Sequence, residues 1–199
     1  MAFNFAKGYK IAKANVIEEG YEIDENSLMA NVSAENIRDV IYHFIAIHEE
    51  PLFFILEIPV KSDRENPIAP GIVDALHKDV YYIDGCSQEE CIALIERYGE
   101  LLINDGMVTF GFGGHETQDE IMVGKYNIIT IYSQNIEEFD DFYEAHDIPQ
   151  RENLITAWDT FSAGAPGQSE KIEVEGKSIY DLPEELKEWG IYLAETREE

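Results

Sequence analysis

The stretch VYYIDGCSQEECIALIERYGELLINDGMVTFGF, residues 80–112, decides the fold that we expect. It opens with the β-branched and aromatic run 80–83, which predicts a strand, and the following Asp84-Gly85 predicts a turn. From about Gln88 to Asn104 the apolar residues recur at helical spacing. The run 107–112 then predicts another strand. Helices and strands therefore alternate closely enough to share one core.

The helix predicted over 88–104 has a clear start signal. Ser87 and Glu90 fit a capping box, in which each side chain accepts a hydrogen bond from the backbone amide of the other residue. Cys86 and Cys91 occupy the two positions of a hydrophobic staple, where cysteine packs as a small apolar residue. Two cysteines are too few for a disulfide framework and are typical of a reducing cytoplasm.

Further elements are predicted on both sides of this stretch. On the N-terminal side, Ser33 is the expected cap of a helix over 34–48, and the apolar run 52–56 predicts a buried strand. The first thirty residues have mixed periodicity and predict irregular or strand-like structure. On the C-terminal side we expect strands at 121–123 and 126–132 and helices at 135–146 and 152–161.

These elements favour an α+β fold, with a mostly antiparallel sheet of about four to six strands and helices packed on one side. A doubly wound α/β sheet is the alternative, but residues 107–132 leave too little room for a crossover helix. The length favours a single domain, 1–199. Within it, residues 162–199 predict a C-terminal appendage made of a hairpin and a helix.

The chain is strongly acidic. It has 41 Asp and Glu against 14 Lys and Arg, a formal net charge of −27 over 199 residues. Such a charge repels nucleic acids and anionic membranes. The most apolar region, 40–60, is interrupted by charged residues and predicts no membrane span. No apolar run follows a basic segment at the N-terminus, so we expect no signal peptide and a cytoplasmic protein.

The glycine-rich loop 111–120 raises two chemical hypotheses. Phosphate binding is disfavoured because acidic residues follow the glycines directly. Cation binding is the alternative hypothesis, with His115, Glu116 and Asp119 as the metal ligands, although their spacing matches neither the calcium loop pattern nor a helical His-Glu-x-x-His. We expect no cofactor, and no residue pattern indicates a catalytic site.

Acidic side chains at two places are candidates for binding a protein partner. On the helix predicted over 135–146, the aromatic residues face the core and the acidic ones face outward. The loop 111–120 supplies the second group. The candidate partner-binding residues are Glu137, Asp140, Asp141, Glu144, Glu116, Asp119 and Glu120.

These observations favour a binding protein over an enzyme. A small, acidic, cytoplasmic chain without motifs resembles, in character only, the bacterial immunity or inhibitor proteins that neutralise cationic toxins such as nucleases. Acidic clusters accelerate encounter with a basic partner through long-range attraction. The alternative is a metal-dependent enzyme of unknown reaction that uses the loop 111–120.

Overall fold

The computed structural model describes residues 3–61, 64–65, 67–69, 72–73 and 76–198. It confirms the α+β class, with a larger sheet than expected: eight strands rather than four to six. In spatial order they are β12 (Tyr192–Glu198), β7 (His77–Cys86), β4 (Leu52–Pro59), β8 (Thr109–Gly114), β9 (Glu120–Val123), β10 (Ile128–Tyr132), β3 (Ser27–Asn31) and β2 (Gly20–Asp24). Every neighbouring pair is antiparallel, which excludes the α/β alternative.

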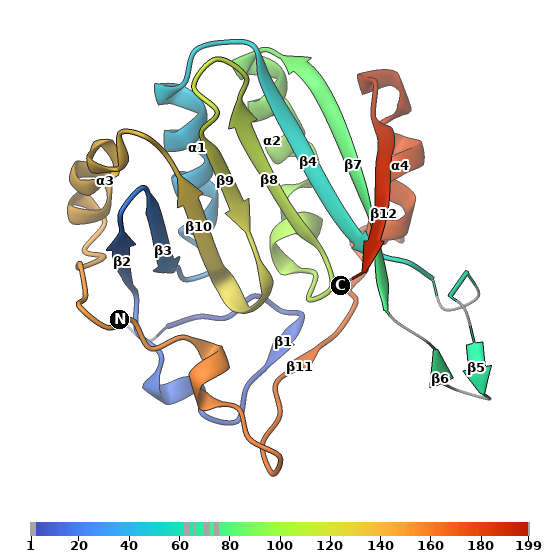
Figure 1. Cartoon of the computed structure of the whole chain (residues 1–199), viewed down its shortest axis with the longest axis horizontal. Helices are drawn as coiled ribbons and strands as arrows, with labels where there is room; N and C mark the ends of the chain where they lie inside the picture. Colours follow the sequence, from blue (N-terminus) through green and yellow to red (C-terminus); the bar gives the residue numbers. More distant parts are fainter. Residues whose placement is uncertain (1–2, 62–63, 66, 70–71, 74–75, 199) are drawn as a thin grey trace.

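Helices cover one face of this sheet, and the other face looks toward the viewer in Figure 1. The α-helices are α1 (Ile37–Ile47), α2 (Gln88–Asn104), α3 (Asp140–Ala145) and α4 (Leu182–Glu185). Short 3-10 helices are η1 (Ala14–Val16), η2 (Lys125–Asn127), η3 (Ile136–Phe139), η4 (Ala157–Thr160), η5 (Ile179–Asp181) and η6 (Lys187–Trp189). Two small ladders pair β1 (Tyr9–Lys10) with β11 (Gln168–Ser169) and β5 (Pro67–Ala69) with β6 (Ile72–Val73).

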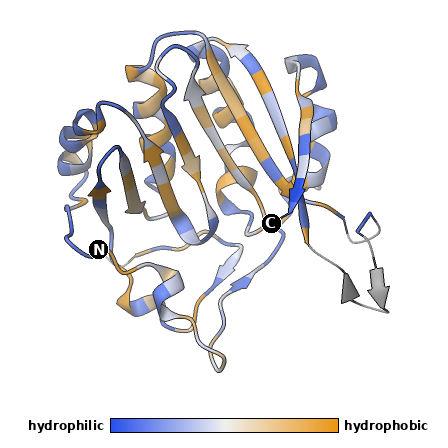
Figure 2. Cartoon of the chain, in the orientation of Figure 1, coloured by the Kyte–Doolittle hydropathy of each residue, from blue (hydrophilic) through white to orange (hydrophobic). Residues whose placement is uncertain are grey.

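The core lies between the sheet and the helices. Phe54 and Leu56 of β4 pair with Phe112 and Phe110 of β8, and all four side chains are fully buried. Hydrophobic residues gather on α1, α2 and the central strands, while the connections at the upper ends of the strands are mostly hydrophilic (Figure 2). The alternation of side chains along each strand sends one apolar set to the helices.

The C-terminal residues join the main sheet and core. Val174 and Lys177 form a tight antiparallel bridge, and the helical turns after it bury Leu182 and Leu186 in the main core. The chain then returns as β12 along β7, a strand that the sequence did not predict. All seven residues of β12 are exposed, because it lies at the edge of the sheet and has no buried face. Its sequence therefore lacks the apolar alternation typical of strands.

The helix predicted over 152–161 is wrong. A capping box between Thr156 and Asp159 starts only the 3-10 turn η4. The residues before it are held by another contact, since the backbone amide of Leu154 donates to Glu22 Oε2 at 2.7 Å. The helix expected from residue 34 starts instead at Ile37, and its N-cap residue makes no side-chain capping bond.

Candidate functional site

Five of the connections at one end of the main sheet are acidic. Strands β2, β7, β8 and β10 end there, while β3, β4, β9 and β12 begin there. We call residues 24–27, 48–51, 84–90, 114–120 and 133–145 the acidic rim. Neither Lys nor Arg occurs in these ranges. The acidic residues of the rim are Asp24, Glu25, Glu49, Glu50, Asp84, Glu89, Glu90, Glu116, Asp119, Glu120, Glu137, Glu138, Asp140, Asp141 and Glu144.

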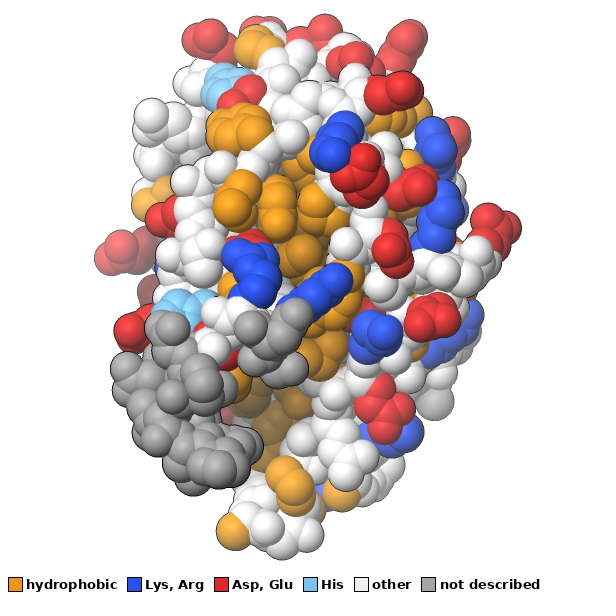
Figure 3. All heavy atoms as spheres, turned by 90° about the vertical axis from the view of Figure 1, so that its right-hand side faces the viewer, with side chains coloured by type: hydrophobic (Ala, Val, Ile, Leu, Met, Phe, Trp, Pro, Cys, Tyr) orange, Lys and Arg blue, Asp and Glu red, His pale blue; other side chains and the backbone are white. Residues whose placement is uncertain are grey.

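Figure 3 shows Asp and Glu side chains along the upper edge of the molecule, with most Lys and Arg lower down. The rim therefore presents one sign of charge. Acidic groups gathered in this way add their potentials and attract cations over a distance set by the ionic strength.

The fold brings the two predicted acidic segments together through Asp119. Its Oδ2 lies 2.9 Å from His48 Nε2 and accepts from the Ser133 hydroxyl at 3.1 Å, while its Oδ1 accepts from the Gln134 amide at 3.3 Å. The side chain is only 8 % exposed. Asp119 therefore joins the loop 114–120 to the segment that leads into η3, and its carboxylate is not available at the surface.

His48, Asp119 and Ser133 do not form a hydrolytic triad. In such a triad the imidazole lies between the carboxylate and the nucleophile. Here the carboxylate lies in the middle and accepts from both neighbours. The other ring nitrogen of His48 lies 2.7 Å from the Phe44 carbonyl, and all three polar residues are buried. This arrangement stabilises the turn and offers no nucleophile to a substrate.

The segment η3–α3 has the two-faced arrangement that the sequence predicted. Phe139 and Tyr143 are fully buried, whereas Glu137, Asp141 and Glu144 are exposed. These three candidate residues thus lie on the surface of the rim.

Asp140 differs from the other acidic residues of this segment. It is half-buried, and its Oδ1 accepts from the Tyr21 hydroxyl at 3.0 Å. Burial, and then this bond, raise the pKa of Tyr21 to about 12. Asp140 therefore helps to hold α3 against β2.

The proposed metal ligands do not converge. His115 is exposed and lies 3.5 Å from Asp84, Glu116 is exposed, and Asp119 is buried against His48. Across the described part of the chain, no three His, Cys, Asp or Glu side chains are grouped so that they could hold a metal ion.

Glu120 lies farther along the same turn, at the start of β9. It is half-buried, and burial raises the pKa of its carboxyl, as does the nearby Glu57. It is therefore a less accessible candidate for a partner than Glu116.

Aromatic rings form a row on the sheet face opposite the helices, beside the rim. The ring of Phe53 lies 5.3 Å from that of His115 and 5.8 Å from that of Tyr82, and Tyr82 lies 6.4 Å from Tyr192. Gly113 makes room for this row, because a Cβ atom there would meet the Phe53 ring at 2.1 Å. The sequence analysis missed the row, since its members come from four separate segments.

Asp84 connects the row to the rim. The Tyr192 hydroxyl donates to Asp84 Oδ2 at 2.6 Å, and this bond raises the pKa of Tyr192. The other carboxylate oxygen of Asp84 is the one that faces His115. Charged and aromatic groups are thus in contact at this end of the sheet.

Comparisons of the chain with protein-family models, with curated proteins and with solved structures gave no match. None of the helices in the described residues is sufficiently long and apolar to cross a bilayer.

Proposed function

We propose that this protein is a cytoplasmic binding module of the inhibitor or immunity type, which neutralises a basic protein such as a toxin or a nuclease. The observation that supports the proposal is the acidic rim, five neighbouring connections without Lys or Arg. A surface of one sign accelerates encounter with an oppositely charged protein and opposes encounter with nucleic acid.

The details of the rim suit protein binding. Glu116, Glu137, Asp141 and Glu144 are exposed, so a partner reaches them without rearrangement of the core. The adjoining aromatic row supplies the flat apolar surface that protein interfaces favour near their centre. The free cysteines Cys86 and Cys91 are consistent with a reducing compartment.

Affinity capture from an extract of the cells that make the protein tests the proposal. The rim variant carries Glu116→Gln, Glu137→Gln, Asp141→Asn and Glu144→Gln. The matched variant carries Glu96→Gln, Glu152→Gln, Glu173→Gln and Glu175→Gln, which change the net charge equally at exposed sites outside the rim. Because both lose the same charge, any difference between them reports on position.

We expect the wild type and the matched variant to retain a protein of positive net charge. The rim variant should associate with it at least about tenfold more slowly at low salt. Association of the wild type should slow further as the salt rises to about 0.5 M, because the screening length shortens. Equal loss of binding in the two variants, or capture of partners without positive charge, would contradict the proposal.

A further inference from the structure

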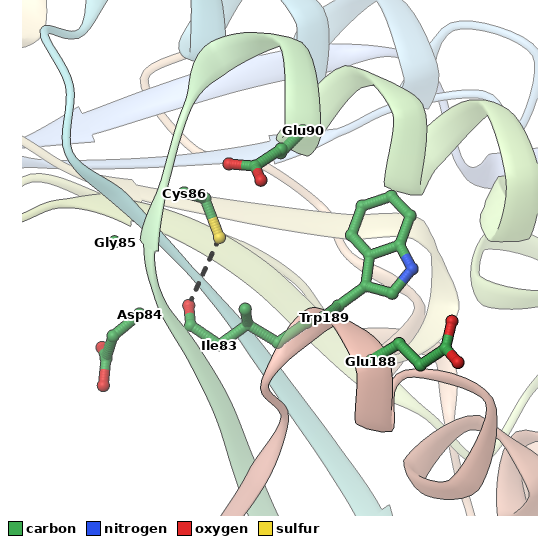
Figure 4. Close-up of a pocket in the computed structure, with 7 residues that line it drawn as sticks. All are labelled: Ile83, Asp84, Gly85, Cys86, Glu90, Glu188 and Trp189. Atoms are coloured by element: carbon green, nitrogen blue, oxygen red, sulfur yellow. Dashed lines mark hydrogen bonds between the residues drawn. The ribbon is translucent and has the colours of Figure 1, made fainter.

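A surface pocket of about 390 Å³ lies at the rim, between the end of β7, the first turn of α2 and η6. Figure 4 shows Cys86, Glu90 and Trp189 around the hollow, with Glu188 beside the indole. Its volume is at the small end of the range for ligand pockets in proteins. The pocket is therefore large enough for one side chain of a partner or for a small molecule.

The lining residues give the pocket negative charge. They include Asp84, Glu90 and Glu188 and no Lys, Arg or His. Glu90 is held in place, since its Oε2 accepts from the Ser87 amide at 2.8 Å and from the Ser87 hydroxyl at 3.0 Å. The Asp84 side chain points to the opposite side of β7, and the Glu188 carboxylate points away from Cys86 beyond the indole (Figure 4), so Glu90 is the carboxylate nearest the hollow.

An anion is disfavoured in this pocket although α2 begins beside it. Two amides of the first turn already have acceptors: the Gln88 amide donates to Glu50 Oε1 at 2.7 Å, and the Glu90 amide donates to Ser87 Oγ at 3.2 Å. These amides are therefore not free to bind a phosphate or a carboxylate. The surrounding carboxylates would repel such a ligand.

Trp189 determines which cation fits best. It is half-buried and packs against the main core, so its indole forms a fixed wall. A guanidinium stacks on an indole through its planar face and donates to carboxylates from its edge, whereas an ammonium has no such plane. Trp189 and Glu90 offer these two kinds of contact, and Glu188 adds negative charge to the lining of the pocket.

We propose that this pocket receives an arginine side chain of the basic partner. The inference rests on the proposed function for the identity of the partner, whereas the pocket itself can be tested alone. Arginine is enriched among the residues that dominate binding energy at protein interfaces. The rim would attract the partner, and the pocket would fix its position.

Hexa-arginine is the probe for a test with the full chain. The chain contains two tryptophans, so Trp158→Phe leaves Trp189 as the only indole emitter. We expect hexa-arginine to change the Trp189 emission saturably and a hexa-citrulline peptide, which is neutral, to leave it unchanged. Hexalysine should bind at least about threefold more weakly than hexa-arginine, because it lacks the planar stacking group.

Calorimetric titrations of three variants follow. Trp189→Leu should weaken hexa-arginine binding by about five- to tenfold, as expected for loss of a stacked contact, and Glu188→Gln by about threefold, as expected for loss of a charge in the lining. Glu96→Gln, an exposed acidic residue on α2 that does not line the pocket, should change it less than twofold. If Trp189→Leu and Glu188→Gln bind the peptide as the wild type does, the pocket does not bind arginine.

The two proposals fail in different ways. A basic protein that is lost from the rim variant yet retained by Trp189→Leu and Glu188→Gln would support the rim and refute the pocket. Specific binding of hexa-arginine at Trp189 without capture of any basic protein would support the pocket and refute the proposed function.

Discussion

Acidic side chains at the two ends of the main sheet have different surroundings. Away from the rim several of them pair with cations: Glu57 pairs with Lys78 and Arg197, and Glu100 pairs with Lys7. At the rim, the connections themselves contain neither Lys nor Arg. The net charge of −27 is therefore unevenly distributed, and the fold determines where the excess lies. The comparison shows that acidic residues of one chain form ion pairs in one region and gather without Lys or Arg in another.

The largest expected effect concerns the buried carboxylate of the rim. Asp119→Ala removes the acceptor of His48, Ser133 and the Gln134 amide and leaves buried donors without partners. We expect it to lower the free energy of unfolding by about 3 kcal/mol. Urea unfolding measures this change. Asp141→Ala, at an exposed position of the same rim, should change stability by less than about 0.5 kcal/mol. Similar values for the two variants would contradict the structural role of Asp119.

A second prediction tests the pairing at the other end. Glu57 is only 5 % exposed and lies against both Lys78 and Arg197. Glu57→Gln leaves two cations without their counter-charge and should lower the free energy of unfolding by about 2 kcal/mol. Breaking a fully buried ion pair would cost more, but Arg197 is half exposed and remains hydrated. Glu100→Gln removes an exposed pair with Lys7 and should cost less than about 1 kcal/mol in the same experiment.

The rim variant used for affinity capture should be more stable than the wild type, unlike the two variants above. Its four substitutions reduce repulsion among exposed acidic groups, so we expect the free energy of unfolding to rise by about 1 kcal/mol at low salt. The gain should vanish in about 1 M salt, where the screening length is about 3 Å. The matched variant should gain less, because its acidic residues are more widely spread. A gain that persists at high salt would show that repulsion within the rim is not its cause.

The smallest effect concerns Tyr21 and its bond to Asp140. The pKa of Tyr21 is raised to about 12, so the folded state holds this proton more tightly than the unfolded state. Its contribution to stability is therefore complete below about pH 10 and is lost as the pH rises from about 10 to 12. Tyr21→Phe should cost about 1 kcal/mol at neutral pH and reduce the loss of stability over that alkaline range. An unchanged alkaline profile, measured by urea unfolding at several pH values, would contradict this interpretation.

Local signals in the sequence were sufficient for some elements. The capping box of Ser87 and Glu90 predicted the start of α2 correctly, because both partners lie within one helical turn. The aromatic and acidic faces of η3–α3 were also predicted, since their spacing is set by the helix itself. Elements defined by distant partners were not: β12 forms only because β7 lies beside it, more than a hundred residues earlier in the sequence.

The same distinction applies to the candidate site. The exposed positions of Glu116 and Asp141 follow from their place in a turn and on a helix. The burial of Asp119 depends on His48, 71 residues away, and no pattern around Asp119 indicates that contact. The pocket beside Trp189 likewise requires η6 to meet the start of α2. Sequence reasoning therefore identified the negative charge of the site, but neither the burial of Asp119 nor the pocket beside Trp189.

The contacts of Asp119 have a consequence for the rate and the entropy cost of the proposed partner binding. Because this one carboxylate fastens the turn after β8 to the start of η3, two acidic segments are already fixed in their mutual positions before any partner arrives. In the proposed complex, little conformational entropy of these segments would remain to be lost, and preorganisation of this kind favours affinity. Capture should then proceed as a docking of prearranged surfaces, at a rate governed by diffusion and steering rather than by loop ordering.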